Sequence, residues 1–268
     1  MADTVLGKEL VAAYRFRIEQ LRGAARRTAV TAWKDLTSYN EADIPRFLET
    51  VLPVLATITD AAVSATDAYL ATFQEFELGV AVSPLGLTDI PIRPTPPEVV
   101  YRRPFVRTWT ALSAGASWSD AVGQGRNTVG MLADTDTQLA ARNAAQAVTS
   151  QSSRIVGYQR VLAPGKNCGL CIVASTQRYS SEDLMPIHSN CGCTVEPLFG
   201  TRAPSRIIDG DSLSLVKDQL RSADLPYTRE AMSRLRIDTD TLPAVSIVSH
   251  GELGPTLWNS AHKFTDAA

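Results

Sequence analysis

All four cysteines of this 268-residue chain, and one of its three histidines, lie within 26 consecutive positions. Cys168 and Cys171 form a C-x-x-C motif, a spacing that lets two thiolates reach one ion from a tight turn. His188, Cys191 and Cys193 follow as H-x-x-C-x-C. Thiolate and imidazole ligands suit zinc better than magnesium or calcium, which prefer oxygen. These five side chains therefore predict a structural zinc site.

Five candidate ligands compete for four tetrahedral positions, so at least one of them is spare. We expect Cys168 and Cys171 on one side of the ion, with His188 and Cys193 opposite and Cys191 as the spare thiol. The stretch between the two motifs contains "SSEDLMP", which has too few apolar residues to offset the entropy of ordering it. A bound ion would hold the two ends of this loop together.

Other chemistries fit the same residues less well. A redox C-x-x-C usually precedes a helix in a thioredoxin-like unit, and two further cysteines would be surplus. A cysteine nucleophile with His188 as its base is chemically possible, but no cysteine stands apart from a chelating pair. Disulfides would require an oxidising compartment. A metal knot, or a metal-free relic packed as ordinary buried thiols, remains the preferred interpretation.

The elements around this cluster predict an α+β protein: a mainly helical N-terminal part followed by a small α+β module with the Cys/His metal knot. Apolar residues recur at helical spacing over 5–38 and 41–78, where Pro53 suggests a kink. Strand propensity appears at 154–162 and 193–199. The expected regions are 1–82 (helical), 83–104 (proline-rich connector), 105–153 (helical), 154–200 (Cys/His module) and 201–268 (short helices and a β-hairpin).

The second helical region and the connector carry finer expectations. Six prolines in 83–104 predict an extended connector, which can lie on the surface or along a neighbouring subunit. Ser117 and Asp120 resemble a capping box. Asp134 or Thr135 could cap a further, alanine-rich helix. The glycines of "GQGRNTVG" do not have the spacing of a nucleotide-binding loop.

Composition excludes several classes of function. The formal net charge of −2 implies no global attraction to nucleic acid or anionic membranes. The N-terminus is charged throughout and has no apolar core, so we expect no signal peptide. No run of 18 apolar residues predicts a membrane span. One local exception is the set Arg15, Arg22 and Arg26, which share a helical face and could contact DNA phosphates non-specifically. The alternative for these arginines is a solvated or acid-paired helix face.

The string "GYQRVLAPGKNCGLCIVASTQRYSSEDLMPIHSNCGCTVEP", together with "ADTDTQLAARNAA" before it and "HGELGPTLW" near the end, closely resembles MuF-like, portal-associated minor head proteins of tailed phages, in their actinobacteriophage form. The resemblance covers roughly Phe105 to Trp258 and is specific in the cysteine block. It implies a virion protein made in the host cytoplasm and incorporated beside the portal or inside the capsid. Its implied partners are the portal protein, the major capsid protein and the scaffold. It implies a part in head morphogenesis, and in DNA packaging or ejection for some members.

Many actinobacteriophage members are labelled capsid maturation proteases, which makes cleavage of scaffold or capsid protein the alternative function. A serine protease needs a histidine close to an activated serine. Outside the cysteine block only His250, beside Ser249 and near Glu252, is a candidate, and "HGELGP" reads equally well as a turn. We therefore assign no catalytic residue and expect a structural protein rather than an enzyme.

Overall fold

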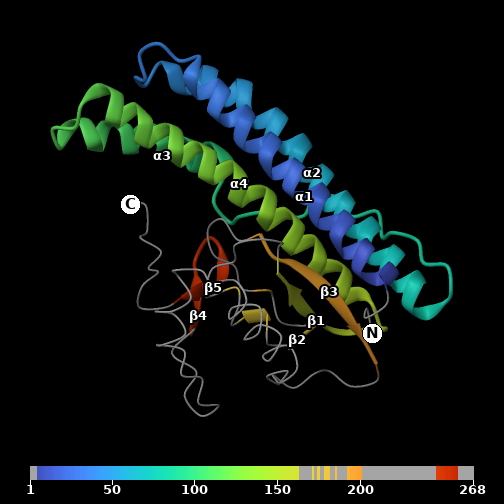
Figure 1. Cartoon of the computed structure of the whole chain (residues 1–268). Coiled ribbons are helices and arrows are strands. Elements are labelled where there is room, and N and C mark those ends of the chain that lie inside the picture. Colours follow the sequence, from blue (N-terminus) through green and yellow to red (C-terminus); the bar gives the residue numbers. More distant parts are fainter. Residues whose placement is uncertain are drawn as a thin grey trace. The chain divides into compact units, whose positions relative to one another are not determined.

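A computed structural model describes residues 5–162, 171, 174–175, 178–181, 185, 192–200 and 246–258. The described chain has four helices followed by small antiparallel sheets, as Figure 1 shows. It divides into two compact units, which are described separately. The helical unit is Ala12–Ala145. The sheet unit takes the chain from Gln146 onward, together with the start of the first helix up to Val11.

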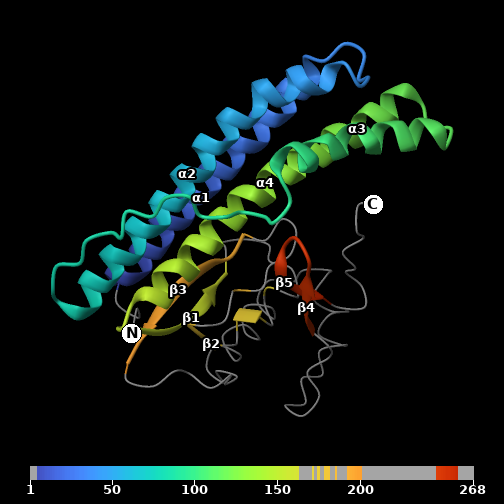
Figure 2. The same ribbon diagram turned by 180° about the vertical axis from the view of Figure 1, so that it is seen from behind.

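The first two helices correspond to the helical patterns at 5–38 and 41–78, and they form a hairpin. Helix α1 spans Val5–Lys34 and α2 spans Asp43–Leu78, and they lie side by side in both views (Figures 1 and 2). Pro53 lies inside α2 without ending it. The connection is fixed by Asp43, whose Oδ2 accepts hydrogen bonds from Ser38 Oγ at 2.7 Å and Asn40 N at 3.4 Å. Gly79, at φ 66°, ends α2 in the left-handed conformation that favours glycine.

The proline-rich connector is shorter than the sequence predicts. Helix α3 spans Pro97–Ser113, so the expected connector of 83–104 loses its last eight residues to a helix. Pro97 stands at the helix start, where its missing N–H would have no intrahelical partner anyway. Pro104 lies within α3 and removes a single backbone hydrogen bond. The number of prolines was therefore misleading, because their positions decide whether a helix can form.

The remaining connector, Val80–Pro96, which we call the strap, is fastened to helices of its own unit. Asp67 of α2 accepts backbone N–H bonds from Leu85, Gly86 and Leu87 at 2.9, 2.8 and 3.2 Å. Apolar strap side chains pack against a small cluster formed by the helices. They are Leu87, Ile90 and Ile92, and the cluster is Leu21, Ala62, Val63, Ala140 and Ala144.

Two further contacts hold the strap to helix α4, which spans Trp118–Gln151. Asn143 Nδ2 donates to the carbonyl of Pro91 at 2.7 Å. Arg93 forms an ion pair with Asp136, and the Tyr101 hydroxyl donates to the same carboxylate at 2.8 Å. Burial and the neighbouring Asp136 charge raise the pKa of Tyr101 well above its usual value. The strap thus lies along its own bundle.

Helix α4 is one continuous helix where the sequence allowed two. Ser117 caps the start of α4, which is half of the predicted capping box: Asp120 N donates to Ser117 Oγ at 3.1 Å, and that hydroxyl donates to the Asp120 side chain at 2.7 Å. Asp134 and Thr135, expected as a possible second cap, lie in mid-helix. Asp134 instead receives both Nε and Nη2 of Arg22, at 3.0 and 2.6 Å. The polar residue that resembled a helix start is a long-range ion-pair partner.

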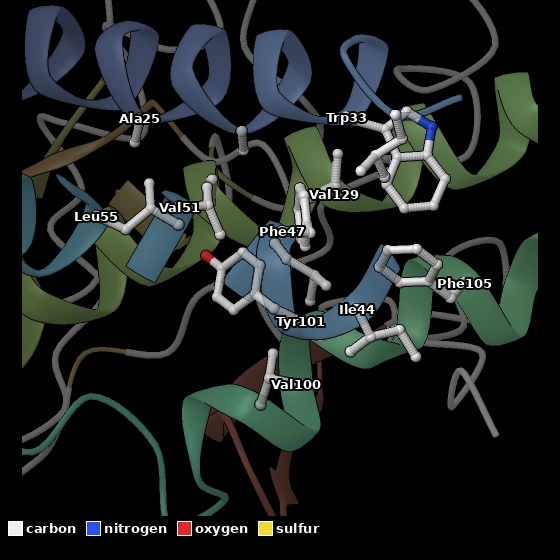
Figure 3. Packing of buried hydrophobic residues seen from close by; sticks show 14 of the residues in the cluster. Ala25, Trp33, Ile44, Phe47, Val51, Leu55, Val100, Tyr101, Phe105 and Val129 are labelled. Carbon is white, nitrogen blue, oxygen red and sulfur yellow. The ribbon is translucent and has the colours of Figure 1, made fainter. Parts of the chain in front are cut away.

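All four helices contribute to one main core (Figure 3). Trp33 of α1 is fully buried between Phe47 of α2 and Phe105 of α3, with ring centroids 5.9 and 4.8 Å away. Its indole N–H donates to the carbonyl of Val122 in α4 at 3.2 Å. Val129 of α4 closes the same cluster. Regions 1–82 and 105–153 of the sequence therefore share one hydrophobic core.

Among the described helices, α2 alone is long and apolar enough to cross a membrane by length and composition. The sequence predicts no such segment. A core helix of a soluble protein meets the same test, and α2 buries the carboxylates Asp43 and Asp67 in the helical unit.

The sheet unit contains a three-stranded antiparallel sheet and a separate hairpin. Strands β1 (Ile155–Val161), β2 (Arg178–Ser180) and β3 (Thr194–Phe199) have the order β2-β1-β3. β1 and β3 correspond to the strands that the sequence predicts at 154–162 and 193–199. The C-terminal hairpin pairs β4 (Ser246–His250) with β5 (Gly254–Trp258). Residues 251–253 make its turn, and Gly254 and Pro255 begin β5.

Candidate metal centre

The three-stranded sheet brings together the chain segments that flank the two cysteine motifs. Val161, the last residue of β1, pairs with Thr194, the first residue of β3. Cys168 lies seven residues after Val161 in the sequence, and Cys193 directly precedes Thr194. Antiparallel pairing therefore starts and ends the cysteine-bearing connection at the same end of the sheet. This placement brings the two cysteine motifs to one end of the sheet, where a single ion could hold both.

Two of the five predicted ligands are described. Cys171 is buried, Cys193 is half-buried, and neither forms a disulfide. Cys168, His188 and Cys191 lie outside the described residues. Within the part of the chain that the structure describes, no group of three or more Cys, His, Asp or Glu side chains is gathered as a metal site would need. The predicted ligand set thus remains a prediction.

A pair of tyrosines ties the connection to the sheet between the two motifs. Tyr179 of β2 is buried, and its ring stacks on Tyr158 of β1 with centroids 5.2 Å apart and planes 10° apart. Its hydroxyl donates to the carbonyl of Ala174 at 3.1 Å, three residues after Cys171. Gln146, at the end of α4, donates to the carbonyl of Ser181 at 2.8 Å. This part of the connection is therefore held by contacts other than a metal.

Sequence reasoning missed a buried arginine in β1. Arg160 is only 3% exposed, and it pairs with Val195 of β3. Cys193 lies two residues before Val195, just ahead of β3. A buried guanidinium close to Cys193 would offset the negative charge of a zinc-bound thiolate. The available signal was one arginine in the otherwise uncharged strand "IVGYQRV".

The geometry of the C-terminal hairpin favours a turn at His250 over a protease site. His250 Nδ1 accepts the backbone N–H groups of Glu252 at 3.2 Å and Leu253 at 3.3 Å, which stabilises the turn. Ser249 and His250 are consecutive in β4, so their side chains leave opposite faces of the hairpin. A nucleophile and its base need to point toward one another.

The three arginines proposed for DNA contact differ in exposure and in their partners. Arg22 is largely buried and bound through two nitrogens to Asp134, the acid-paired alternative for this residue. Arg26 is exposed and Arg15 is half-buried. A guanidinium committed to an internal carboxylate cannot also neutralise a phosphate without breaking that pair. Any phosphate contact from this face would therefore rest on Arg15 and Arg26.

Comparisons with models of protein families, with curated proteins and with solved structures found no match to this chain. The class that the described residues define is a four-helix part followed by a small antiparallel sheet.

Proposed function

We propose that this chain is a phage minor head protein of the MuF-like type, which joins the portal and the capsid interior during head assembly. The observation that carries the proposal is the pairing of Val161 with Thr194. Through this pairing, the two ends of the cysteine-bearing segment that resembles these proteins are joined in one antiparallel sheet. The rest of the described chain is an α-helical bundle with buried ion pairs, which suits a structural part rather than a catalytic one. The role in DNA packaging or ejection, with phosphate contact by Arg15 and Arg26, belongs to the same proposal.

The proposed cofactor is one structural zinc, held by Cys168, Cys171, His188 and Cys193 with Cys191 as the spare thiol. The residues fit this ion in chemistry, since thiolates and imidazole are its preferred ligands. Cys193 adjoins β3, whose residue Val195 pairs with the buried Arg160 of β1. The ion would tie the loop after β1 to the start of β3, a contribution of roughly 10 kcal/mol in small zinc modules.

Metal analysis of the purified protein tests the zinc site. We expect about one zinc per chain, lost together with thermal stability in Cys168→Ser, whereas Cys191→Ser should retain both. Ser119→Ala, at an exposed position of α4 outside the motif, is the control for the effect of purification and handling. Metal-free protein whose melting is unchanged by Cys168→Ser would show that the cluster is a relic of packed thiols.

Incorporation into heads tests the function itself. The protein should be detected by antibody in procapsids purified from phage-producing cells, and should be lost from procapsids assembled without portal protein. His250→Ala should leave both incorporation and scaffold cleavage unchanged, because its imidazole serves a turn. Absence from portal-containing procapsids would refute the head assignment. Loss of scaffold cleavage in His250→Ala would favour the maturation protease.

A further inference from the structure

Charge is segregated between the two helices of the N-terminal hairpin. Helix α1 carries seven Lys and Arg against two Glu, a formal charge of +5. Helix α2 carries six Asp and Glu against one Arg, a formal charge of −5. The whole chain is only −2, so this contrast is local to the hairpin. The basic helix of one molecule is therefore complementary in charge to the acidic helix of a second molecule.

Much of this charge is exposed and is not used inside the helical unit. Arg17, Arg27 and Lys34 of α1 are exposed, as are three acids of α2, Glu49, Asp60 and Glu75. Within the part of the chain that the structure describes, these six residues make no ion pair with one another or with other side chains. The acid–base pairs of this unit are formed by other residues, such as Arg22 with Asp134.

The outer face of α2 is smooth and almost uncharged between its acids. Only 33% of its most apolar 18-residue window is buried. Three exposed threonines give their hydroxyl hydrogens to backbone carbonyls four residues earlier, so each presents mainly its methyl group to solvent. They are Thr50, Thr57 and Thr72, at 2.8, 3.1 and 2.9 Å. Pro53, Val54, Ala56 and Ala68 are exposed beside them. Such a surface allows another helix to approach closely.

Helix α1 presents a matching apolar projection. Phe16 is 63% exposed, with the exposed Ala12 and Ala13 one turn earlier on the same face. Arg17 and Arg27 are ten residues apart, or about 15 Å along a helix, and Glu49 and Asp60 are eleven apart, or about 16 Å. Glu49 and Asp60 of one molecule can therefore face Arg17 and Arg27 of another. Phe16 would then lie on the threonine- and alanine-lined outer face of α2.

We propose that the outer face of α1 in one molecule docks on the outer face of α2 in a second copy of this chain. The two faces differ, so the contact is heterologous: each molecule keeps one unused face of each kind and can add another copy. Such contacts close into a ring if the rotation permits and otherwise continue as a filament. This inference stands independently of the proposed head function, since it uses only the helical unit.

Sedimentation of the full-length protein tests this contact. Wild type should self-associate at low salt and dissociate as salt rises, because exposed charges are screened. Arg17→Glu/Arg27→Glu should be monomeric, as should Glu49→Lys/Asp60→Lys. An equimolar mixture of these two variants should associate as wild type does, because the remaining native faces fit each other and the two reversed faces are complementary as well. Combining all four changes in one chain should restore self-association.

The control Arg107→Glu/Arg126→Glu changes two exposed charges on α3 and α4 and should associate as wild type does. Circular dichroism melting checks that each variant folds, and Arg17→Gln/Arg27→Gln replaces the reversal if that variant does not. Monomeric wild type at low salt and high protein concentration would overturn the proposal. So would an unchanged association in either face variant, or the absence of association in the mixture.

Discussion

Gly125 shows how a single residue fixes the packing of the helical unit. A methyl group built at this position would lie 2.3 Å from Thr108 Oγ1, 2.4 Å from Trp33 Cζ2 and 3.0 Å from the carbonyl of Pro104. Two of these neighbours are fully buried and the third is backbone, so none can move away easily. The glycine lets α4 approach α1 and α3, and the "GQGRNTVG" segment is a packing surface of a helix.

We expect Gly125→Ala to lower the free energy of unfolding by about 1–3 kcal/mol, because overpacking forces neighbouring side chains and backbone to shift. Gly123→Ala, in the same helix with no atom within 4 Å of the new methyl group, is the matched control. It should be neutral or stabilise by up to about 1 kcal/mol, as alanine favours helices. Denaturant unfolding of both variants measures the difference. Equal effects would mean that the close approach at Gly125 is not real.

The carboxylate of Asp43 should make stability depend on pH in the acid range. The hydrogen bond from Ser38 is the main cause that lowers the pKa of Asp43 below its ordinary value of 3.8. The folded state therefore binds this proton more weakly than the unfolded state does. The resulting stabilisation is complete above pH 3.8 and is lost as the pH falls through the lowered folded pKa. Thermal melting between pH 5 and 2 should show a shallower acid loss in Asp43→Asn than in wild type, whereas an equal loss would contradict this role.

At the scale of elements, the sequence predicted those whose signal is local. Helical periodicity gave α1 and α2, and β-branched and aromatic residues gave β1 and β3. The early start of α3 was missed because prolines were counted without regard to helix position. The continuity of α4 was missed because Asp134 resembles a cap until Arg22, 112 residues away, is known as its partner. A partner so distant in the sequence gives no signal in the residues that neighbour Asp134.

For the candidate metal centre, too, one part could be predicted from the sequence and another part could not. The cysteine and histidine spacing is visible in the sequence, and it is the whole basis of the zinc prediction. The role of Arg160 and the stacking of Tyr158 on Tyr179 depend on strand register, which places residues 20 to 40 positions apart opposite one another. Register follows from which face is buried, and that is a property of the folded sheet.

The strap should depend on Asp67. Its carboxylate accepts three backbone N–H groups, so Asp67→Asn, which offers one acceptor oxygen and an amide donor, leaves some of them unpaired. We expect a loss of about 1–3 kcal/mol and faster proteolysis within 80–96. Asp60→Asn, on the exposed side of the same helix, is the control. Unchanged cleavage of the strap in Asp67→Asn would show that its apolar contacts alone hold it.

At the scale of the whole molecule, the shared core limits which experiments can be interpreted. Removing 2–82 would delete Trp33 and Phe47 from the core that Phe105 and Val129 complete. A truncated chain would fail in an assembly assay through loss of folding, whatever α1 and α2 bind. Surface variants such as Arg17→Glu/Arg27→Glu leave this core intact, so they can separate binding from stability.

The same core has a consequence for synthesis on the ribosome. Helix α1 is made first, yet its Arg22 and Trp33 find their partners in α4, the last helix of the bundle. Contacts of such long sequence separation cannot form until most of residues 12–145 have left the exit tunnel. During that interval the apolar sides of α1 and α2 have only each other for cover. We therefore expect the nascent chain to expose apolar helix surface, of the kind that chaperones bind, until translation has passed residue 145.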